Sequence, residues 1–430
     1  MNALKKLFGG DLRQFGMLIT LVVMIAFFQI ATGGLVLTPT NMMNLLNGNS
    51  YILILSIGMV LVIIAGHIDL SVGSVAAVVG IIVAIATHDF NVPWWAAVLL
   101  GLLIGVLIGA WDGWWMAYVG IPGFIVTLAG MMLFRGLNQA IGHSLTVPVP
   151  EEIQYLGGGY LPEIGPSLPF NNLTVLLGVV AIAALAWGQL RSRAQLAKIN
   201  AATPPMWVTI VRIVAIGVVL AYLTMLYATG RPGTSFPVAG LILVVLVIIY
   251  TFVSQRTIIG RHVYAIGGNR NAAELSGVKS KKVYFLVMLN MSVLSALAGI
   301  MFVGRSTASG PFDGVGWELD AIAAVFIGGA AVSGGVGTVV GSMIGGFVMA
   351  VLNNGLQLMG IGADATQMIK GMVLLLAVAV DVLNKKQGRP SILGYLMPKK
   401  AAPAVTGGPL PQAPAGPIEE QASLDPNPAA

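Results

Sequence analysis

The polar residues that interrupt long apolar stretches are the first candidates for chemistry in this 430-residue chain. Ionisable groups in such stretches are costly, so they are functional hypotheses by default. A path for a neutral polyhydroxylated solute would need uncharged amides and aromatic faces rather than a full relay of charges. The candidates for such a path are Asp112, Trp115, Asn138, Asn353, Asn354 and Gln357.

A second interpretation of these residues remains open. The amides can bond neighbouring helices, and Trp115 with its neighbouring tryptophans can belong to an interfacial belt. Asp69 follows a histidine and an isoleucine between two apolar stretches, which favours a turn or helix cap over a ligand. Arg135 and Lys370 can each pair with an acid, which the sequence does not identify.

The motifs of the common catalytic sites do not occur in the sequence. The nearest approach to a phosphate-binding loop, at 277–280, lacks the Gly-Lys pair that brings amides and an ammonium to one phosphate. There is no H-E-x-x-H or G-x-S-x-G motif, no cysteine, and only four scattered histidines. We therefore expect no catalytic residues, no metal and no cofactor, and a chain that is not itself an enzyme.

The composition indicates the elements that must position the polar residues. Hydrophobic residues make up 57% of the chain and charged residues only 9%, whereas a soluble domain carries roughly 25% charged residues. These values exclude a soluble single-domain enzyme, a disordered chain and a nucleic-acid binder. The apolar runs do not alternate with polar residues, so a β-barrel is excluded as well. We predict an all-α integral membrane protein, a polytopic bundle of about ten to twelve transmembrane helices.

About 20 apolar residues are needed to span a bilayer as a helix. The segment 319–333 is short and glycine-rich, so it can be a half-helix or re-entrant segment. The segment 15–33 is predicted as a retained first helix, with a signal-peptide core as the alternative. The twelve predicted spans are 15–33, 50–66, 70–87, 94–118, 123–141, 172–190, 207–228, 237–253, 283–303, 319–333, 336–358 and 366–383.

The lysines and arginines predict the orientation of the chain. Most of the 22 lie in four groups, at the N-terminus, in 191–212, in 254–282 and after residue 383. With twelve crossings all four groups fall on one side, which the positive-inside rule makes cytoplasmic. Both termini are therefore predicted to be cytoplasmic.

The predicted organisation has six parts. The loop 142–171 contains five prolines and three consecutive glycines, so it is expected to be irregular, with a docking role. The parts are a cytoplasmic N-terminus (1–14), an N-terminal transmembrane half (15–141), the external loop (142–171), an inserted helix pair (172–236), a C-terminal transmembrane half (237–383) containing a cytoplasmic loop (254–282), and a cytoplasmic tail (384–430) that is disordered from about 401.

The loop 254–282 is strongly basic and contains Glu274 as its one acid. Asn271 and Glu274 fit a capping box, and Gly277 fits a helix stop, so one short helix is predicted near 272–276. Such a helix at a membrane surface can transmit force to a partner. The alternative is an ordinary basic loop that sets the topology and touches lipid phosphates.

Two sets of glycines recur every four residues and present smooth stripes for close helix approach. Each stripe can serve packing within one chain or self-association across a dimer seam. The helix-packing candidates are Gly101, Gly105 and Gly109 in one set, and Gly337, Gly341 and Gly345 in the other.

Four blocks of sequence resemble the permeases of ribose/xylose-type ATP-binding-cassette (ABC) importers. They are IIAGHIDLSVGSV at 63–75, IPGFIVTLAGMMLFRGL at 121–137, IGRHVYAIGGNRNAAELSGV at 259–278, and the glycine-rich stretch 318–361. The blocks occur in the family's order. Their resemblance implies that the 259–278 region couples to the ATPase, through Arg261, Gly267, Gly268, Asn269, Asn271, Glu274 and Gly277.

Three departures from the family pattern stand out. The region 172–228 adds two spans that shorter members lack, so the chain is most similar to the xylose and multiple-sugar permeases. His67 and Asp112 stand where relatives commonly have other residues.

The resemblance implies a membrane-spanning subunit that translocates xylose or a related pentose or hexose inward. It also implies a location in a bacterial inner membrane, a homodimer, a cytoplasmic ABC ATPase and a periplasmic sugar-binding protein that docks on 142–171 and 304–318. Membrane lipid is the remaining partner, and no nucleic acid is expected. The alternatives are a proton-coupled sugar symporter using Asp112, and a membrane-embedded enzyme or signalling protein.

Overall fold

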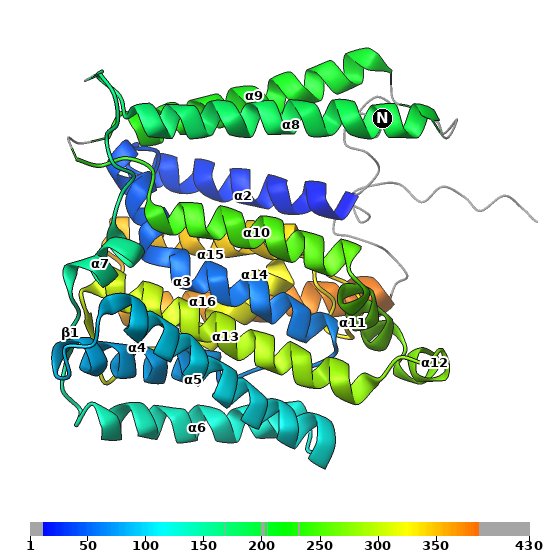
Figure 1. Cartoon of the computed structure of the whole chain (residues 1–430). Helices are drawn as coiled ribbons and strands as arrows, with labels where there is room; N and C mark the ends of the chain where they lie inside the picture. The colour runs from blue at the N-terminus through cyan, green and yellow to red at the C-terminus, as the bar shows by residue number, and fades with distance from the viewer. Residues whose placement is uncertain (1–11, 167, 199–202, 204, 231–232, 387–430) are drawn as a thin grey trace, which may run out of the picture.

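The computed structural model describes residues 12–386, except 167, 199–202, 204 and 231–232. The first eleven residues and the predicted disordered tail lie outside the described residues. The described chain is a bundle of helices that run in alternating directions, as Figure 1 shows. The prediction of an all-α polytopic membrane protein is confirmed.

The long helices correspond one by one to predicted apolar segments. They are α2 (Leu12–Ala31), α3 (Pro39–Ile64), α4 (Val72–His88), α5 (Trp94–Trp114) with a π-helical turn η1 (Trp115–Val119), α6 (Gly123–Ile141), α8 (Asn172–Lys198), α9 (Met206–Ala228), α10 (Val238–Arg256), α13 (Ser280–Ser306), α15 (Val339–Leu358) and α16 (Ala363–Lys386). Eight of the helices in the described residues are long and apolar enough to cross a membrane, counting α5 and η1 as one.

The segment predicted at 319–333 is a half-helix. Helix α14 (Trp317–Ile327) has 11 residues, about 16 Å at 1.5 Å per residue, which is about half of a hydrocarbon core of about 30 Å. The chain continues without helix through 328–338. Non-helical backbone at membrane depth is tolerated where protein surrounds it, and Ala330 and Ala331 in this stretch are buried.

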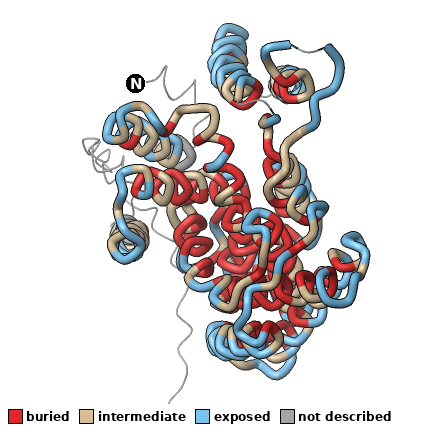
Figure 2. The backbone as a smooth tube through the Cα atoms, turned by 90° about the vertical axis from the view of Figure 1, so that its left-hand side faces the viewer, coloured by how far each residue is buried: buried red, intermediate tan, exposed pale blue. Residues whose placement is uncertain are grey.

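Helices α3 and α13 form the centre of the bundle, where Figure 2 shows the buried backbone. Helix α13 packs against α3, α4 and α5. The close α5–α13 contact depends on glycines: a Cβ at Gly105 would lie 2.6 Å from the Cβ of Ala296, and one at Gly109 2.6 Å from the Cα of Leu289. Gly101 faces Val83 on α4 in the same way. This stripe therefore packs within the chain.

The second glycine set does not form one helical stripe, so that part of the prediction is wrong. Gly337 precedes α15, since Thr338 is the N-cap of that helix and accepts a hydrogen bond from the Gly341 amide at 2.9 Å. Gly341 and Gly345 do lie on α15 and face α14: added Cβ atoms would come within 2.4 Å of the Gly328 carbonyl oxygen and 1.9 Å of the Ala324 carbonyl oxygen.

Helices α8 and α9 pack mainly on each other along one edge of the bundle (Figure 1). Most of their apolar side chains are exposed, including Val179 and Val218. Such surfaces suit contact with lipid tails. Two helices form in this region as predicted. That the pair is an insertion, and that it divides the chain into two halves, stay predictions.

The short elements lie at the two ends of the bundle (Figure 1). We call one the α7 end, after α7 (Glu151–Gly158). There β1 (Val147–Pro148) pairs antiparallel with β2 (Ala308–Ser309), which joins two loops distant in sequence. The loop 142–171 was predicted to be irregular, but it contains β1 and α7. The opposite end, the α12 end, carries α11 (Ile258–Gly268) and α12 (Arg270–Leu275).

Candidate functional site

The basic loop after α10 folds into two short helices rather than the one predicted. Thr257 starts α11 by accepting a hydrogen bond from the Gly260 amide at 3.2 Å. Gly260, Val263 and Ile266 are buried toward the bundle, while Arg261 is exposed. This 3-residue spacing gives α11 one apolar face, which holds it against the membrane-embedded helices.

The N-cap of helix α12 lies two residues before the predicted capping box. The side chain of Asn269, in extended conformation, accepts a hydrogen bond from the Ala272 amide at 3.0 Å. Asn271 already lies inside the helix and is exposed, so it is not the cap. Gly277 follows the helix with φ +87°, the left-handed conformation that commonly ends helices.

Glu274 has a different role from the predicted cap. Its carboxylate accepts a hydrogen bond from the hydroxyl of Ser280, on the first turn of α13, and another from Nε of Arg270 at 2.9 Å. The Ser280 hydroxyl and then Arg270 lower the pKa of Glu274, and the bond to Glu274 raises the pKa of Arg270. Both groups therefore stay charged at neutral pH and tie α12 to α13.

The end of α11 is pressed against the interior of the bundle. A Cβ at Gly267 would lie 1.7 Å from the Ile64 carbonyl oxygen at the end of α3, and 2.6 Å from the Gly335 amide nitrogen. The Gly335 amide itself donates to that carbonyl at 2.8 Å. The hydroxyl of Tyr264 donates to the Gly337 carbonyl at 2.7 Å. A displacement of α11 would therefore strain or break its contacts with α3 and with the segment before α15. Gly268 has open space where its Cβ would be.

A second line of contacts runs inward from α12. The guanidinium of Arg270 lies over the ring of Tyr284, 5.6 Å from its centroid. The Tyr284 ring meets His67 edge-on, with centroids 4.6 Å apart. His67, between α3 and α4 in the chain, packs against the start of α6, where a Cβ at Gly123 would be 3.1 Å from its Nδ1. This departure from the family pattern therefore lies between Tyr284 of α13 and α6.

Leu275 was missed by sequence reasoning. It is the last residue of α12 and is 91% exposed. A large apolar side chain held at the tip of a polar helix is a candidate protein contact, although single exposed leucines are common. The signal in the sequence was the one leucine of the basic loop 254–282.

Among the pathway candidates, Asp112 and Trp115 lie near each other on α5 and η1. Asp112 is fully buried, and neither of its carboxyl oxygens has a hydrogen-bond partner among the described residues. The buried Nε1 of Trp115 is likewise unpartnered there. Asp69 lies close to Asp112 and accepts hydrogen bonds from the Ser71 amide at 2.8 Å and hydroxyl at 2.6 Å, which is the expected turn role.

The amide candidates lie elsewhere. Asn138 on α6 donates to the carbonyls of Gly310 and Pro311 at 3.3 and 3.2 Å. Asn354 and Asn41 exchange two hydrogen bonds of 2.9 Å between α15 and α3, so Asn354 bonds neighbouring helices.

Asn353 and Gln357 complete the predicted set. The Oδ1 of Asn353 is buried without a partner among the described residues, and Gln357 is exposed. Neither α5 nor α6 packs extensively against α15. One copy of the chain therefore does not gather the six pathway candidates around a single cavity.

The two cations whose partners the sequence left open both pair with acids in the first turn of α14. Lys370 on α16 lies 2.8 Å from the carboxylate of Asp320, and both side chains are largely buried. Arg135 on α6 lies 3.8 Å from Glu318. The half-helix is thus fixed by ion pairs from both sides.

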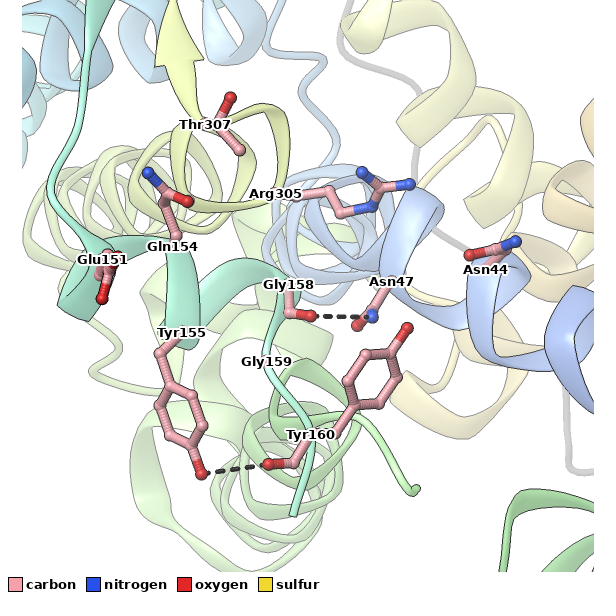
Figure 3. Close-up of a pocket in the computed structure, with 11 residues that line it drawn as sticks. Asn44, Asn47, Glu151, Gln154, Tyr155, Gly158, Gly159, Tyr160, Arg305 and Thr307 are labelled. Atoms are coloured by element: carbon pink, nitrogen blue, oxygen red, sulfur yellow. Dashed lines mark hydrogen bonds between the residues drawn. The ribbon is translucent and has the colours of Figure 1, made fainter. Parts of the chain in front are cut away.

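A polar pocket of about 460 Å³ opens at the α7 end, between the start of α3, α7 and the end of α13 (Figure 3). No sequence pattern indicated it, because its residues come from three distant segments. Its lining is Asn44, Asn47, Glu151, Gln154, Tyr155, Gly158, Gly159, Tyr160, Gly304, Arg305 and Thr307.

The fold and these contacts define a multi-pass membrane protein that contains a half-helix, α14, and a two-helix element, α11 and α12, at one end. A family model described as "Branched-chain amino acid transport system / permease component" matches residues 41–378. The chain belongs to this permease family. The sequence resemblance to ribose/xylose-type ABC permeases is confirmed by the individual relatives.

The "Xylose transport system permease protein XylH" of Haemophilus influenzae is 40% identical over 89% of this chain and 99% of the relative. The protein of the same name from Escherichia coli K12 is 35% identical over 88% and 93%. The E. coli K12 "Ribose import permease protein RbsC" is 32% identical over 86% and 93%. No solved structure matches the chain significantly.

Proposed function

We propose that this chain is the membrane-spanning subunit of an ABC importer that carries xylose, or a closely related monosaccharide, inward. The observation that carries the proposal is the contact of Gly267 with Ile64 and Gly335. We call α11 and α12 a lever because they would transmit force: a displacement of these two helices by a partner bound at the α12 end would act on α3 and on the segment before α15.

The charge distribution supports a cytoplasmic α12 end. Arg256, Arg261 and Arg270 lie at this end, and so does Lys198 at the end of α8, because α8 and α10 both start at the α7 end. Cytoplasmic loops of membrane proteins carry an excess of such residues. The α7 end then faces outward.

The motor and the receptor are proposed as separate proteins. The sequence has no phosphate-binding loop, so a cytoplasmic ATPase would supply the energy by contacting Arg261, Asn271 and Leu275. A binding protein would dock at the α7 end, where β1 and β2 join the loops 142–171 and 304–318. Two copies of the chain would enclose the pathway and alternate which side it faces.

Xylose is the proposed sugar because two relatives, at 40% and 35% identity over nearly their whole length, are named as xylose permeases. The family description refers to amino acids, but an amino-acid zwitterion would need charged groups along its path. The amide oxygen of Asn353 and the indole nitrogen of Trp115, which have no hydrogen-bond partner among the described residues, can bond a neutral solute.

Uptake into proteoliposomes tests this proposal. The chain would be reconstituted with its ATPase and a loaded sugar-binding protein, and accumulation of labelled pentoses and hexoses measured. ATP-dependent accumulation of xylose, unaffected by an uncoupler, is expected. Accumulation that needs a proton gradient and no ATP would contradict the proposal.

One observation favours a second candidate, a proton-coupled sugar symporter. Asp112 is a fully buried carboxyl group without a partner among the described residues, as a proton carrier in a membrane would be. In that case Asp112→Asn would abolish uptake. If the variant transports normally, the symporter is rejected, and Asp112 has a structural role.

A further inference from the structure

The pocket at the α7 end contains a buried acceptor without a donor. Asn47 on α3 is 2% exposed, and its Nδ2 faces the Gly158 carbonyl oxygen at 3.5 Å. With the amide in this orientation, Oδ1 is the free atom. Oδ1 is buried and has no hydrogen-bond partner among the described residues. Leaving a buried acceptor unpaired is costly, which points to a ligand that donates a hydrogen bond to this oxygen.

Further polar groups converge on the same place. In Figure 3 the side chains of Asn44, Asn47 and Arg305 and the ring of Tyr160 lie on one side of the pocket. Arg305 forms no hydrogen bond or ion pair with any described residue. The hydroxyl of Tyr155 donates to the Tyr160 carbonyl at 3.1 Å, which holds this wall in position.

The chemistry of the lining favours a neutral ligand with several hydroxyl groups. Arg305 and Glu151 carry opposite charges, and the other polar side chains of the lining are neutral, so no net charge selects an anion. A carboxylate could accept from Arg305 but could not donate to Asn47. A sugar hydroxyl can do both, because it is donor and acceptor together. A volume of about 460 Å³ lies in the range of small-molecule sites.

The position of Asn47 connects this pocket to the other end of the molecule. Asn47 and Ile64 lie on the same helix, α3, and Ile64 touches Gly267 of α11. A ligand on Asn47 therefore rests on the helix that the α12 end contacts directly.

We propose that the pocket formed by α3, α7 and α13 is an entry site for a neutral monosaccharide, bound through Asn47, Tyr160 and Arg305, with the exposed Asn44 lining the pocket without being required for binding. It would receive the sugar at the outer face before the sugar enters the pathway between two copies. This inference rests on the proposed function for the identity of the ligand and the direction of transport, but its binding chemistry can be tested alone.

The absence of cysteine from the chain allows a direct test. The full-length Asn44→Cys variant, in proteoliposomes without binding protein, is treated with a polar maleimide, with and without xylose. Xylose at about ten times its dissociation constant should slow the modification about tenfold, because the free fraction falls in that proportion. The control is Phe90→Cys, exposed at the same end but outside the pocket, and betaine replaces xylose to match osmolality.

A second pair of variants separates binding from folding. Adding Asn47→Leu to Asn44→Cys should abolish the protection. Adding Asn49→Leu should leave it, because Asn49 lies on the same helix and bonds only to its own helix, at the Leu45 carbonyl. Membrane level and ATP-driven uptake are measured for each variant.

The outcomes are distinct for the two proposals. Unprotected Asn44→Cys overturns the entry site, even if ATP-driven xylose uptake is intact. Protection without any ATP-driven uptake keeps the site and overturns the proposed function. If sugar-free binding protein protects Asn44→Cys and xylose does not, the pocket receives a partner side chain, and the entry site is again rejected.

Discussion

At the scale of single residues, we expect the largest losses of stability where one partner of a buried ion pair is removed. Asp320 and Lys370 lie 2.8 Å apart, with little exposure of either side chain. Removing one partner of such a pair leaves an uncompensated charge, whereas replacing both by apolar residues is often neutral. The pair fixes α14 against α16, so its loss should loosen the half-helix.

We expect Lys370→Met to lower the free energy of unfolding by about 3–5 kcal/mol, and the double variant Lys370→Met, Asp320→Leu to recover most of it. Arg135→Met should cost less, because Arg135 is more exposed and lies 3.8 Å from Glu318. Unfolding of the purified protein in denaturant measures all three. A loss of less than about 1 kcal/mol for Lys370→Met would contradict the assignment of a buried pair.

Glu274 gives a pH prediction. Its pKa is lowered by the Ser280 hydroxyl and Arg270, so the contribution of the carboxylate to stability is present above the unfolded pKa of about 4.3. That contribution is lost as the pH falls through the lower folded pKa. Amide protection in α12, measured by hydrogen exchange and corrected for intrinsic rates, should be constant from about pH 8 to 5 and then fall. Glu274→Gln should show weaker protection without that fall; an equal fall in the variant would assign it to another group.

The residue-scale predictions from sequence succeeded where chemistry is local. Gly277 ends α12 as its position indicated, and Asp69 serves a turn. The N-cap was predicted at Asn271 rather than Asn269 because Glu274 stands three residues after Asn271, as in a capping box, whereas Glu274 bonds Ser280 and Arg270 instead. The partners of Lys370 and Asn354 are 50 and 313 residues away, and no local pattern contains that information.

At the scale of elements, the end of α11 is the best place to test the proposed lever. A Cβ at Gly267 would overlap the Ile64 carbonyl oxygen, whereas Gly268 has open space around it. Overpacking costs about 1–3 kcal/mol when neighbours must shift. We expect Gly267→Ala to impair ATP-driven uptake strongly at an unchanged membrane level, and Gly268→Ala to transport like the unaltered protein. Equal rates for both variants would show that the contact does not limit transport.

The long helices were predictable because crossing a bilayer requires about 20 apolar residues. The shorter elements were not. Helix α7 was hidden by the surrounding prolines and glycines, and α11 by the basic loop around it, because helices of about ten residues depend on tertiary contacts. Gly260 and Gly267 allow those contacts through their lack of a side chain, which sequence spacing alone did not reveal.

At the scale of the whole molecule, α3 joins the two ends of the bundle. It carries Asn47 of the pocket near one end and Ile64 against α11 at the other. Sequence could predict that the ends differ in charge, but not that one buried helix connects them. The proposed coupling therefore requires that the α12 end face the cytoplasm and that a partner cover its exposed tip.

The most direct test of that claim uses Leu275→Cys as the single cysteine in the chain. A membrane-impermeant maleimide should label this variant in inverted membrane vesicles and not in intact cells, and adding the ATPase subunit should suppress the labelling. Labelling from the outside of intact cells would contradict the account.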